Sequence, residues 1–105
     1  MKAVAFAPEA EAELAEALGW YRSRDPKLTT TLLDDVAQAV EQIGLLPHRF
    51  AMLKAFKPPV RRARLKRFPY ALVFVDLPDR IEILAVAHAK RRPLYWLERM
   101  PTTTT

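Results

Sequence analysis

Residues 68–100, FPYALVFVDLPDRIEILAVAHAKRRPLYWLERM, decide how this chain folds. Two apolar runs, residues 70–75 and 81–87, flank a turn-forming segment at residues 77–80. Both runs are rich in Val, Ile, Leu and Phe and contain no Gly or Pro, which is typical of strands in a sheet core. The stretch therefore predicts two adjacent antiparallel strands, a hairpin at the centre of a sheet.

The second of these strands leads directly into residues 88–96, HAKRRPLYW. A histidine, three cations and two aromatic rings thus follow the end of a rigid, buried element. Binding and catalytic residues are often carried on loops that such a scaffold positions. We therefore expect the working surface of the protein here.

The first half of the chain predicts a short strand at residues 2–6 and then two helices. Pro8 stands at a favourable first helical position, with three glutamates in the turns that follow. Asp25 and Pro26 end one helix and start the next, because Asp is a good N-cap and Pro a good first residue. Apolar residues recur at helical spacing in both helices, which predicts a helix hairpin packed on the sheet.

Residues 47–59 contain Pro47, Pro58 and Pro59 and predict a loop with little regular structure. Residues 60–68 then alternate, which predicts a strand with one apolar face and one cationic face. Ala63 and Leu65 share the apolar face. After the central hairpin, residues 94–99 predict a short helix.

The predicted fold class is α+β. The elements are an N-terminal strand, a helix hairpin, a three-stranded antiparallel meander and a short C-terminal helix, and the strands form one mainly antiparallel sheet. A chain of 105 residues holds one core. We predict a single domain at residues 1–100 and a disordered tail at residues 101–105, which are Pro and four Thr.

Charge is distributed unevenly along the chain, whose formal net charge is +5. Residues 1–53 carry five Lys or Arg against eight Asp or Glu, whereas residues 54–100 carry twelve against four. This asymmetry predicts an anionic partner for the second half, either nucleic acid or an acidic protein segment.

The composition excludes several classes of site. There is no cysteine, so neither disulfides nor thiolate metal sites exist. No His, Asp and Glu residues have metal-ligand spacing, and neither glycine lies in a phosphate-binding loop, so we expect no metal and no cofactor. No apolar run is long enough to span a bilayer, and the acidic N-terminal segment is unlike a signal peptide. We expect a cytoplasmic protein with no membrane partner.

The candidate binding residues are cations with aromatic rings among them, on a sheet that can hold a phosphodiester backbone and stack bases. The candidates are Arg62, Arg64, Lys66, Arg67, Lys90, Arg91 and Arg92, with Tyr70, Tyr95 and Trp96 as the rings. If RNA is cleaved here, His88 or Tyr95 can transfer protons, and Arg91 can stabilise charge that develops on phosphate.

Each candidate also has a structural interpretation. The cations of residues 62–66 fit a solvated sheet face equally well. His88 is expected to share a face with Leu84 and Val86, which favours a hydrogen-bonded scaffold histidine. Trp96 favours a lid that packs the short helix onto the sheet over a base-stacking platform.

Three features of the chain resemble the RelE/ParE superfamily of type II toxins over residues 1–100. They are the element order, the Phe68-Pro69-Tyr70 entry to the central strand, and the ending His88-x-x-Arg91-x-Pro93-x-Tyr95-Trp96. The resemblance makes Tyr70, His88, Pro93 and Trp96 structural motif positions. It implies a growth-inhibiting toxin of the plasmid-stabilisation kind, neutralised by a cognate antitoxin with an acidic C-terminal segment. Operator DNA is then contacted only through the antitoxin.

Two activities occur in this superfamily. RelE-like members cleave mRNA on the ribosome with basic residues and a C-terminal tyrosine, whose positions here are those of Arg62, Arg64, Arg91 and Tyr95. ParE-like members act on DNA gyrase and lack that catalytic set. Ala71 stands where the RelE pattern has an arginine, and the spacing after the last strand is like that of the ParE branch. A ParE-like toxin, which is not an enzyme, is favoured. The alternatives are a RelE-like endoribonuclease and an inactive relative that only binds its antitoxin.

Overall fold

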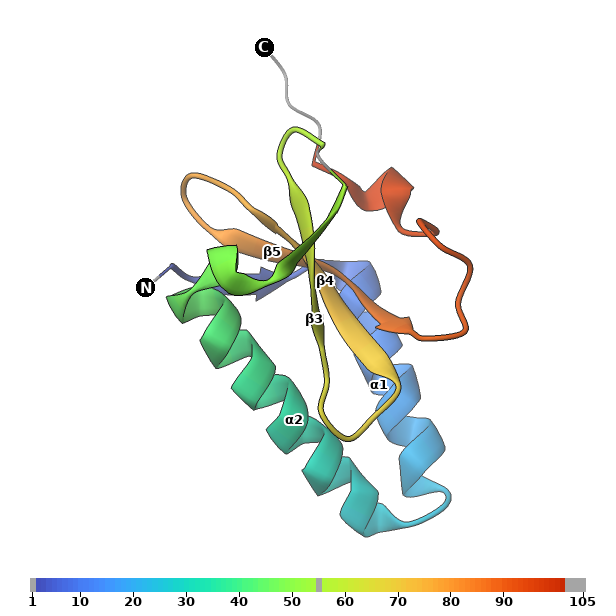
Figure 1. The fold of residues 1–105 in the computed structure, drawn as a ribbon. Helices are drawn as coiled ribbons and strands as arrows, with labels where there is room; N and C mark the ends of the chain where they lie inside the picture. The colour runs from blue at the N-terminus through green and yellow to red at the C-terminus, as the bar shows by residue number, and fades with distance from the viewer. Residues whose placement is uncertain (1, 55, 102–105) are drawn as a thin grey trace.

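The structure is a computed structural model that describes residues 2–54 and 56–101. Two helices and a five-stranded sheet make up the fold, with two short 3-10 turns (Figure 1). The elements are β1 (Val4–Phe6), α1 (Pro8–Arg22), α2 (Pro26–Leu45), η1 (Pro47–Arg49), β2 (Ala51–Lys54), β3 (Val60–Arg64), β4 (Tyr70–Asp76), β5 (Ile81–His88) and η2 (Leu97–Arg99). The predicted α+β class is confirmed. Of the tail predicted to be disordered, residues 102–105 lie outside the described part of the chain.

The two helices begin where the sequence predicts. Pro8 and Pro26 are the first residues of α1 and α2, and the Asp25 carboxylate caps α2 by accepting the backbone N–H of Lys27 at 3.0 Å. Buried residues at helical spacing, among them Ala10 on α1 and Leu32 on α2, turn toward the sheet. Neither helix, nor any other helix of the described residues, has the length and apolar character to cross a membrane.

The sheet has the strand order β1-β5-β4-β3-β2, in which only the β1–β5 pair is parallel. Strands β4 and β5 are buried on both faces of the sheet. Residues such as Leu72 and Phe74 pack under the helix hairpin, whereas Val73 and Val75 pack on the opposite face against Trp96. Figure 1 shows α1 passing behind β4, and the orange-red C-terminal segment on the side of the sheet away from α2. The sheet is therefore the middle layer of the molecule.

The structure adds a fourth strand to the predicted meander. Residues 47–59 were expected to form a loop, but β2 forms within them and pairs antiparallel with β3, with Ala51 opposite Arg62. The three prolines flank this strand and do not interrupt it, so they leave its backbone free to pair. The prolines mark the ends of an edge strand here.

Two other predicted elements are shorter than expected. The strand expected over residues 60–68 ends at Arg64. The helix expected over residues 94–99 is only the 3-10 turn η2, because Leu94 has a φ of 62°, outside the helical region. Together these changes leave irregular chain on both sides of the groove described below.

A β-bulge in β5 corrects the expected neighbours of His88. The register between β4 and β5 shifts after Val73, so Leu84 and Ala85 both lie on the face that Trp96 covers. Val86 then returns to the helix face, as does His88 two residues later. His88 shares a face with Val86 but not with Leu84, because the extra residue inverts the alternation.

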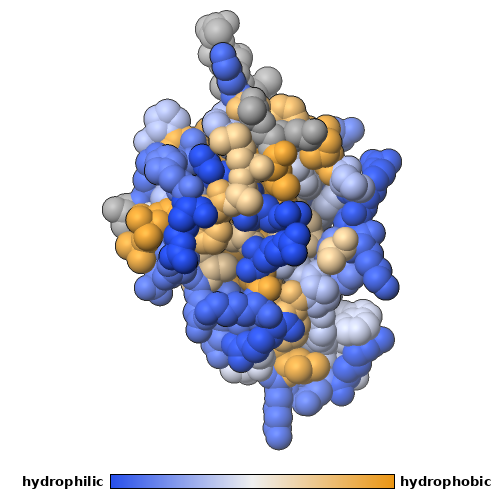
Figure 2. Space-filling model, in the orientation of Figure 1, coloured by the Kyte–Doolittle hydropathy of each residue, from blue (hydrophilic) through white to orange (hydrophobic). Residues whose placement is uncertain are grey.

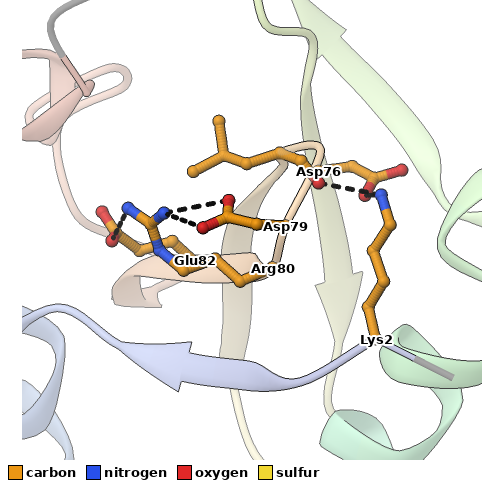
Figure 3. A network of polar contacts seen from close by, with 6 residues as sticks. Lys2, Asp76, Asp79, Arg80 and Glu82 are labelled. Carbon is orange, nitrogen blue, oxygen red and sulfur yellow. Dashed lines mark hydrogen bonds and ion pairs between the residues drawn. The ribbon is translucent and has the colours of Figure 1, made fainter.

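A polar network fastens the start of the chain to the β4–β5 turn (Figure 3). The Lys2 Nζ donates to the Asp76 carboxylate at 2.7 Å and to the Leu77 carbonyl at 2.8 Å. Arg80 bridges Asp79 in the same turn and Glu82 at the start of β5. Neither Lys2 nor Arg80 is among the candidate binding cations named above.

Candidate binding groove

A groove of about 460 Å³ lies on the sheet face opposite the helix hairpin, beside the C-terminal segment. We call it the cationic groove. Its floor includes the small apolar residues Ala71, Val73 and Ala87, and none of the described residues that line it is acidic. Four arginines line it, and they are Arg62, Arg64, Arg91 and Arg92.

The arginines come from two elements whose geometry places them together. Strand β3 alternates, so that Ala63 packs under the helices while Arg62 and Arg64 extend over the opposite face. Arg91 follows β5 in a tight turn, in which its backbone N–H donates to the His88 carbonyl at 2.9 Å. The backbone N–H of Ala89 donates to the Pro69 carbonyl at 2.8 Å and holds this turn beside the entry to β4.

Three predicted cations lie outside the groove. Lys66 and Lys90 are exposed and do not line it. Arg67 is held by Asp35 of α2, whose carboxylate accepts the backbone N–H, the Nε–H and an Nη–H of Arg67 at 2.8–2.9 Å. This contact ties the β3–β4 turn to α2.

Tyr95 is engaged in a second polar network, with Glu13 of α1 and Arg99. The Tyr95 hydroxyl donates to Glu13 Oε2 at 2.7 Å, and Arg99 donates to both oxygens of the same carboxylate. Glu13 also accepts the backbone N–H of Val86 at 3.0 Å, and Arg99 donates to the Leu84 carbonyl at 3.0 Å. The network thus satisfies backbone groups of β5 at its bulge.

These contacts shift the ionisation of both side chains. Burial alone raises the pKa of the Glu13 carboxyl, but the hydrogen bonds from Arg99, Tyr95 and Val86 outweigh it and lower the pKa below its ordinary value. Burial, together with the hydrogen bond to Glu13, raises the pKa of the Tyr95 hydroxyl. A hydroxyl that holds its proton and donates it to a carboxylate is poorly suited to act as a general base.

The motif residues surround the end of the groove. Tyr70 and His88 are opposite one another on β4 and β5, with ring centroids 5.0 Å apart in an edge-to-face arrangement. The His88 Nδ1 accepts the backbone N–H of Lys90 at 3.0 Å. Pro93 lines the groove, and Trp96 is 3% exposed in the core on that face.

The charge of the groove contrasts with an apolar interior. On the face turned toward the viewer in Figure 2, hydrophobic residues run down the centre between strongly hydrophilic ones. Arg91 is positioned over the Tyr95 ring, with its Cζ 4.1 Å from the ring centroid.

The described residues contain no group of three or more His, Cys, Asp or Glu that could hold a metal ion.

Sequence reasoning missed the two carboxylates that organise this region. Glu13 and Asp35 each lie on the inward stripe of a helix, three residues after the buried Ala10 and Leu32. A charged residue at a core position needs a partner, so the positions of these two carboxylates on the apolar stripes already predict that each forms an ion pair. The identity of the partners, Arg99 and Arg67, depends on tertiary contacts between distant parts of the chain.

Comparison of the sequence with known protein families gives one match. A sequence model described as "ParE toxin of type II toxin-antitoxin system, parDE" matches residues 4–93. The chain belongs to the ParE toxin family. The family implies an antitoxin partner. No curated protein matches the chain in sequence.

The fold agrees with that of a chain in a solved ParDE structure. A chain of the chromosomal ParDE toxin–antitoxin system from P. aeruginosa superposes with a TM-score of 0.73 at 18% sequence identity. The match covers 86% of this chain and 98% of that one. At this identity the likeness supports the fold alone, which agrees with the order and pairing of elements described above.

Proposed function

We propose that this chain is a ParE-like toxin that inhibits DNA gyrase in the cytoplasm and is neutralised when an acidic antitoxin segment fills the cationic groove. The match to the ParE family over residues 4–93 carries the proposal. The groove supports it, because four arginines with no acidic residue among the described lining attract an anionic segment. An antitoxin seated there would cover the surface that acts on the target.

The contacts in the groove favour gyrase inhibition over RNA cleavage. Ribonuclease chemistry needs a proton acceptor near the attacking hydroxyl and cations on the phosphate. Tyr95 is committed to Glu13, and Ala71 presents only a methyl group to the groove floor. The arginines can bind an anion, but Tyr95, which stands at the position of the catalytic tyrosine, is not free to accept a proton.

The proposal is tested by expressing the chain in bacteria without an antitoxin and by adding the purified chain to a gyrase supercoiling assay. We expect growth arrest with a DNA-damage response, intact mRNA and a dose-dependent loss of supercoiling. Arrest with cleaved mRNA and normal supercoiling would assign the RelE-like activity. Absence of arrest would indicate an inactive relative that only binds an antitoxin.

The groove itself is tested by the double variant Arg62→Glu/Arg64→Glu. We expect loss of growth arrest with a melting temperature close to that of the parent chain, because both side chains extend into the groove. The matched control is Arg22→Glu/Lys27→Glu, the same charge change at exposed positions on the helix hairpin. Equal loss of toxicity in the control would assign the effect to net charge and contradict a role for the groove.

A further inference from the structure

A second, smaller pocket of about 290 Å³ lies between α1 and the ends of β4 and β5. We call it the aromatic pocket. Of its lining residues the gyrase proposal uses only Arg91, and Glu16, Trp20 and Tyr21 do not line the cationic groove. The residues that matter below are Glu16, Trp20, Tyr21, Tyr70, His88 and Arg91.

The rings of this pocket form a connected series from α1 to β5. The centroids of Trp20 and Tyr21 are 4.9 Å apart, those of Tyr21 and Tyr70 are 6.5 Å apart, and Tyr70 contacts His88. All these pairs meet edge to face, which is an arrangement that aromatic pairs prefer. Trp20 is 51% exposed, although Arg24 already covers one face of its indole, with the Cζ 3.3 Å from the ring centroid.

Polar groups converge on the same space. The Glu16 carboxylate makes no ion pair or hydrogen bond within the described part of the chain. Because the His88 Nδ1 accepts a backbone N–H, a neutral His88 carries its proton on Nε2 and can donate it. Burial raises the pKa of the Tyr70 hydroxyl, and the nearby Tyr21 and Glu16 raise it further, so Tyr70 also remains a donor.

The aromatic pocket is continuous with the cationic groove. Tyr70, His88 and Arg91 line both of them. A ligand that extends across these three residues contacts arginines in the cationic groove, and it contacts aromatic rings and the unpaired Glu16 carboxylate in the aromatic pocket. An acidic peptide suits only the arginine side, since Glu16 repels a further carboxylate.

We propose that the aromatic pocket binds one base of a single-stranded nucleic acid whose phosphates lie in the cationic groove. A base brings a flat face for the rings and N–H groups for Glu16, and the adjoining phosphodiester brings the negative charge that the arginines require. This binding activity is separate from gyrase inhibition and does not depend on it.

Guanine is the base that matches the polar groups. Its N1–H and N2–H donate side by side to a single carboxylate, which Glu16 supplies. Its O6 and N7 accept from an arginine or a histidine, which Arg91 and His88 supply. Adenine presents an acceptor at N1 that faces the Glu16 carboxylate unfavourably. We expect a preference for guanine over adenine of about tenfold.

The experiment measures binding of the full chain to a short labelled oligonucleotide that holds one guanine in a run of uridines, at several salt concentrations. Trp20→Ala should weaken binding about tenfold or more without changing the slope of log K against log salt. Arg64→Ala should reduce that slope instead, because it removes a phosphate contact. Glu16→Gln should abolish the preference for guanine, and Glu11→Gln, exposed on the same helix but outside the pocket, should not.

Further arms identify the source of the nucleotide and guard against misfolding. The same sequence in DNA distinguishes RNA from single-stranded DNA, and guanosine monophosphate tests a free nucleotide. Tyr70→Phe, which keeps the ring and removes the hydroxyl, is a second variant if Trp20→Ala lowers the melting temperature. Oligonucleotide affinity unchanged by Trp20→Ala and Glu16→Gln, or guanosine monophosphate binding as tightly as the oligonucleotide, would overturn the proposal.

Discussion

At the scale of single residues, two inward carboxylates decide how distant segments meet. Asp35 is 3% exposed, and its charge is compensated by the backbone and side chain of Arg67. The Arg67 side chain is itself 55% exposed, so the pair is asymmetric. The carboxylate depends on the arginine for its solvation, whereas the arginine can turn to water.

This asymmetry predicts unequal costs of removing the two partners. Arg67→Ala leaves a buried carboxylate with only a backbone N–H and should lower the free energy of unfolding by about 3 kcal/mol. Asp35→Ala frees an arginine that water can solvate and should cost about 1–2 kcal/mol. Urea unfolding of both variants and of the double variant measures the difference. Equal costs, or a double variant much less stable than Asp35→Ala, would contradict this account.

At the scale of elements, the C-terminal segment covers the second face of the sheet with the short 3-10 turn η2 as its regular structure. Leu94 adopts a positive φ, and after it Trp96 is buried in the core on that face, while Tyr95 packs against the same core and its hydroxyl donates to Glu13. Tyr95 and Arg99 then bind Glu13 of α1. The segment is fastened by a carboxylate on the first helix.

The Glu13 contacts predict a stability that depends on pH. The pKa of Glu13 is lower in the folded chain than in the unfolded chain, so its contribution is full above the unfolded value and is lost as the pH falls through the folded value. Glu13→Gln should lower the free energy of unfolding by about 2 kcal/mol at neutral pH, with a smaller difference in acid. Thermal unfolding across this range, with Glu11→Gln as control, measures it. A difference independent of pH would show that the charge on Glu13 plays no part.

The sequence was informative about elements whose signals are local. Asp25 and Pro26 locate the helix boundary, and the two apolar runs locate β4 and β5, because capping, fixed φ and strand composition act within a few residues. Strand β2 was missed, because a short edge strand depends on the neighbour it pairs with. The bulge at Leu84 was missed for the same reason, and with it the face of His88.

At the scale of the whole molecule, the sequence predicted the four arginines of the groove together, but it placed three other cations with them. Arg62 and Arg64 were predicted on one face and lie in the groove, because alternation along a strand is local. Arg67 was predicted with them but contacts Asp35, since the strand ends before it. The aromatic pocket was not predicted, because Trp20 and Tyr70 meet only through packing of α1 on the sheet.

The continuous apolar runs of β4 and β5 also carry a prediction about cooperativity. Strands buried on both faces join the core under the helices to the core under Trp96, with Phe74 and Val75 as neighbours on opposite sides. A single domain over residues 1–100 should therefore unfold in one transition. In the variant Trp20→Phe, fluorescence reports Trp96 on one face, and far-ultraviolet circular dichroism reports α1 and α2 on the other. Coincident thermal transitions are expected. If the fluorescence transition comes first, the C-terminal layer melts independently and the two cores are not one cooperative unit.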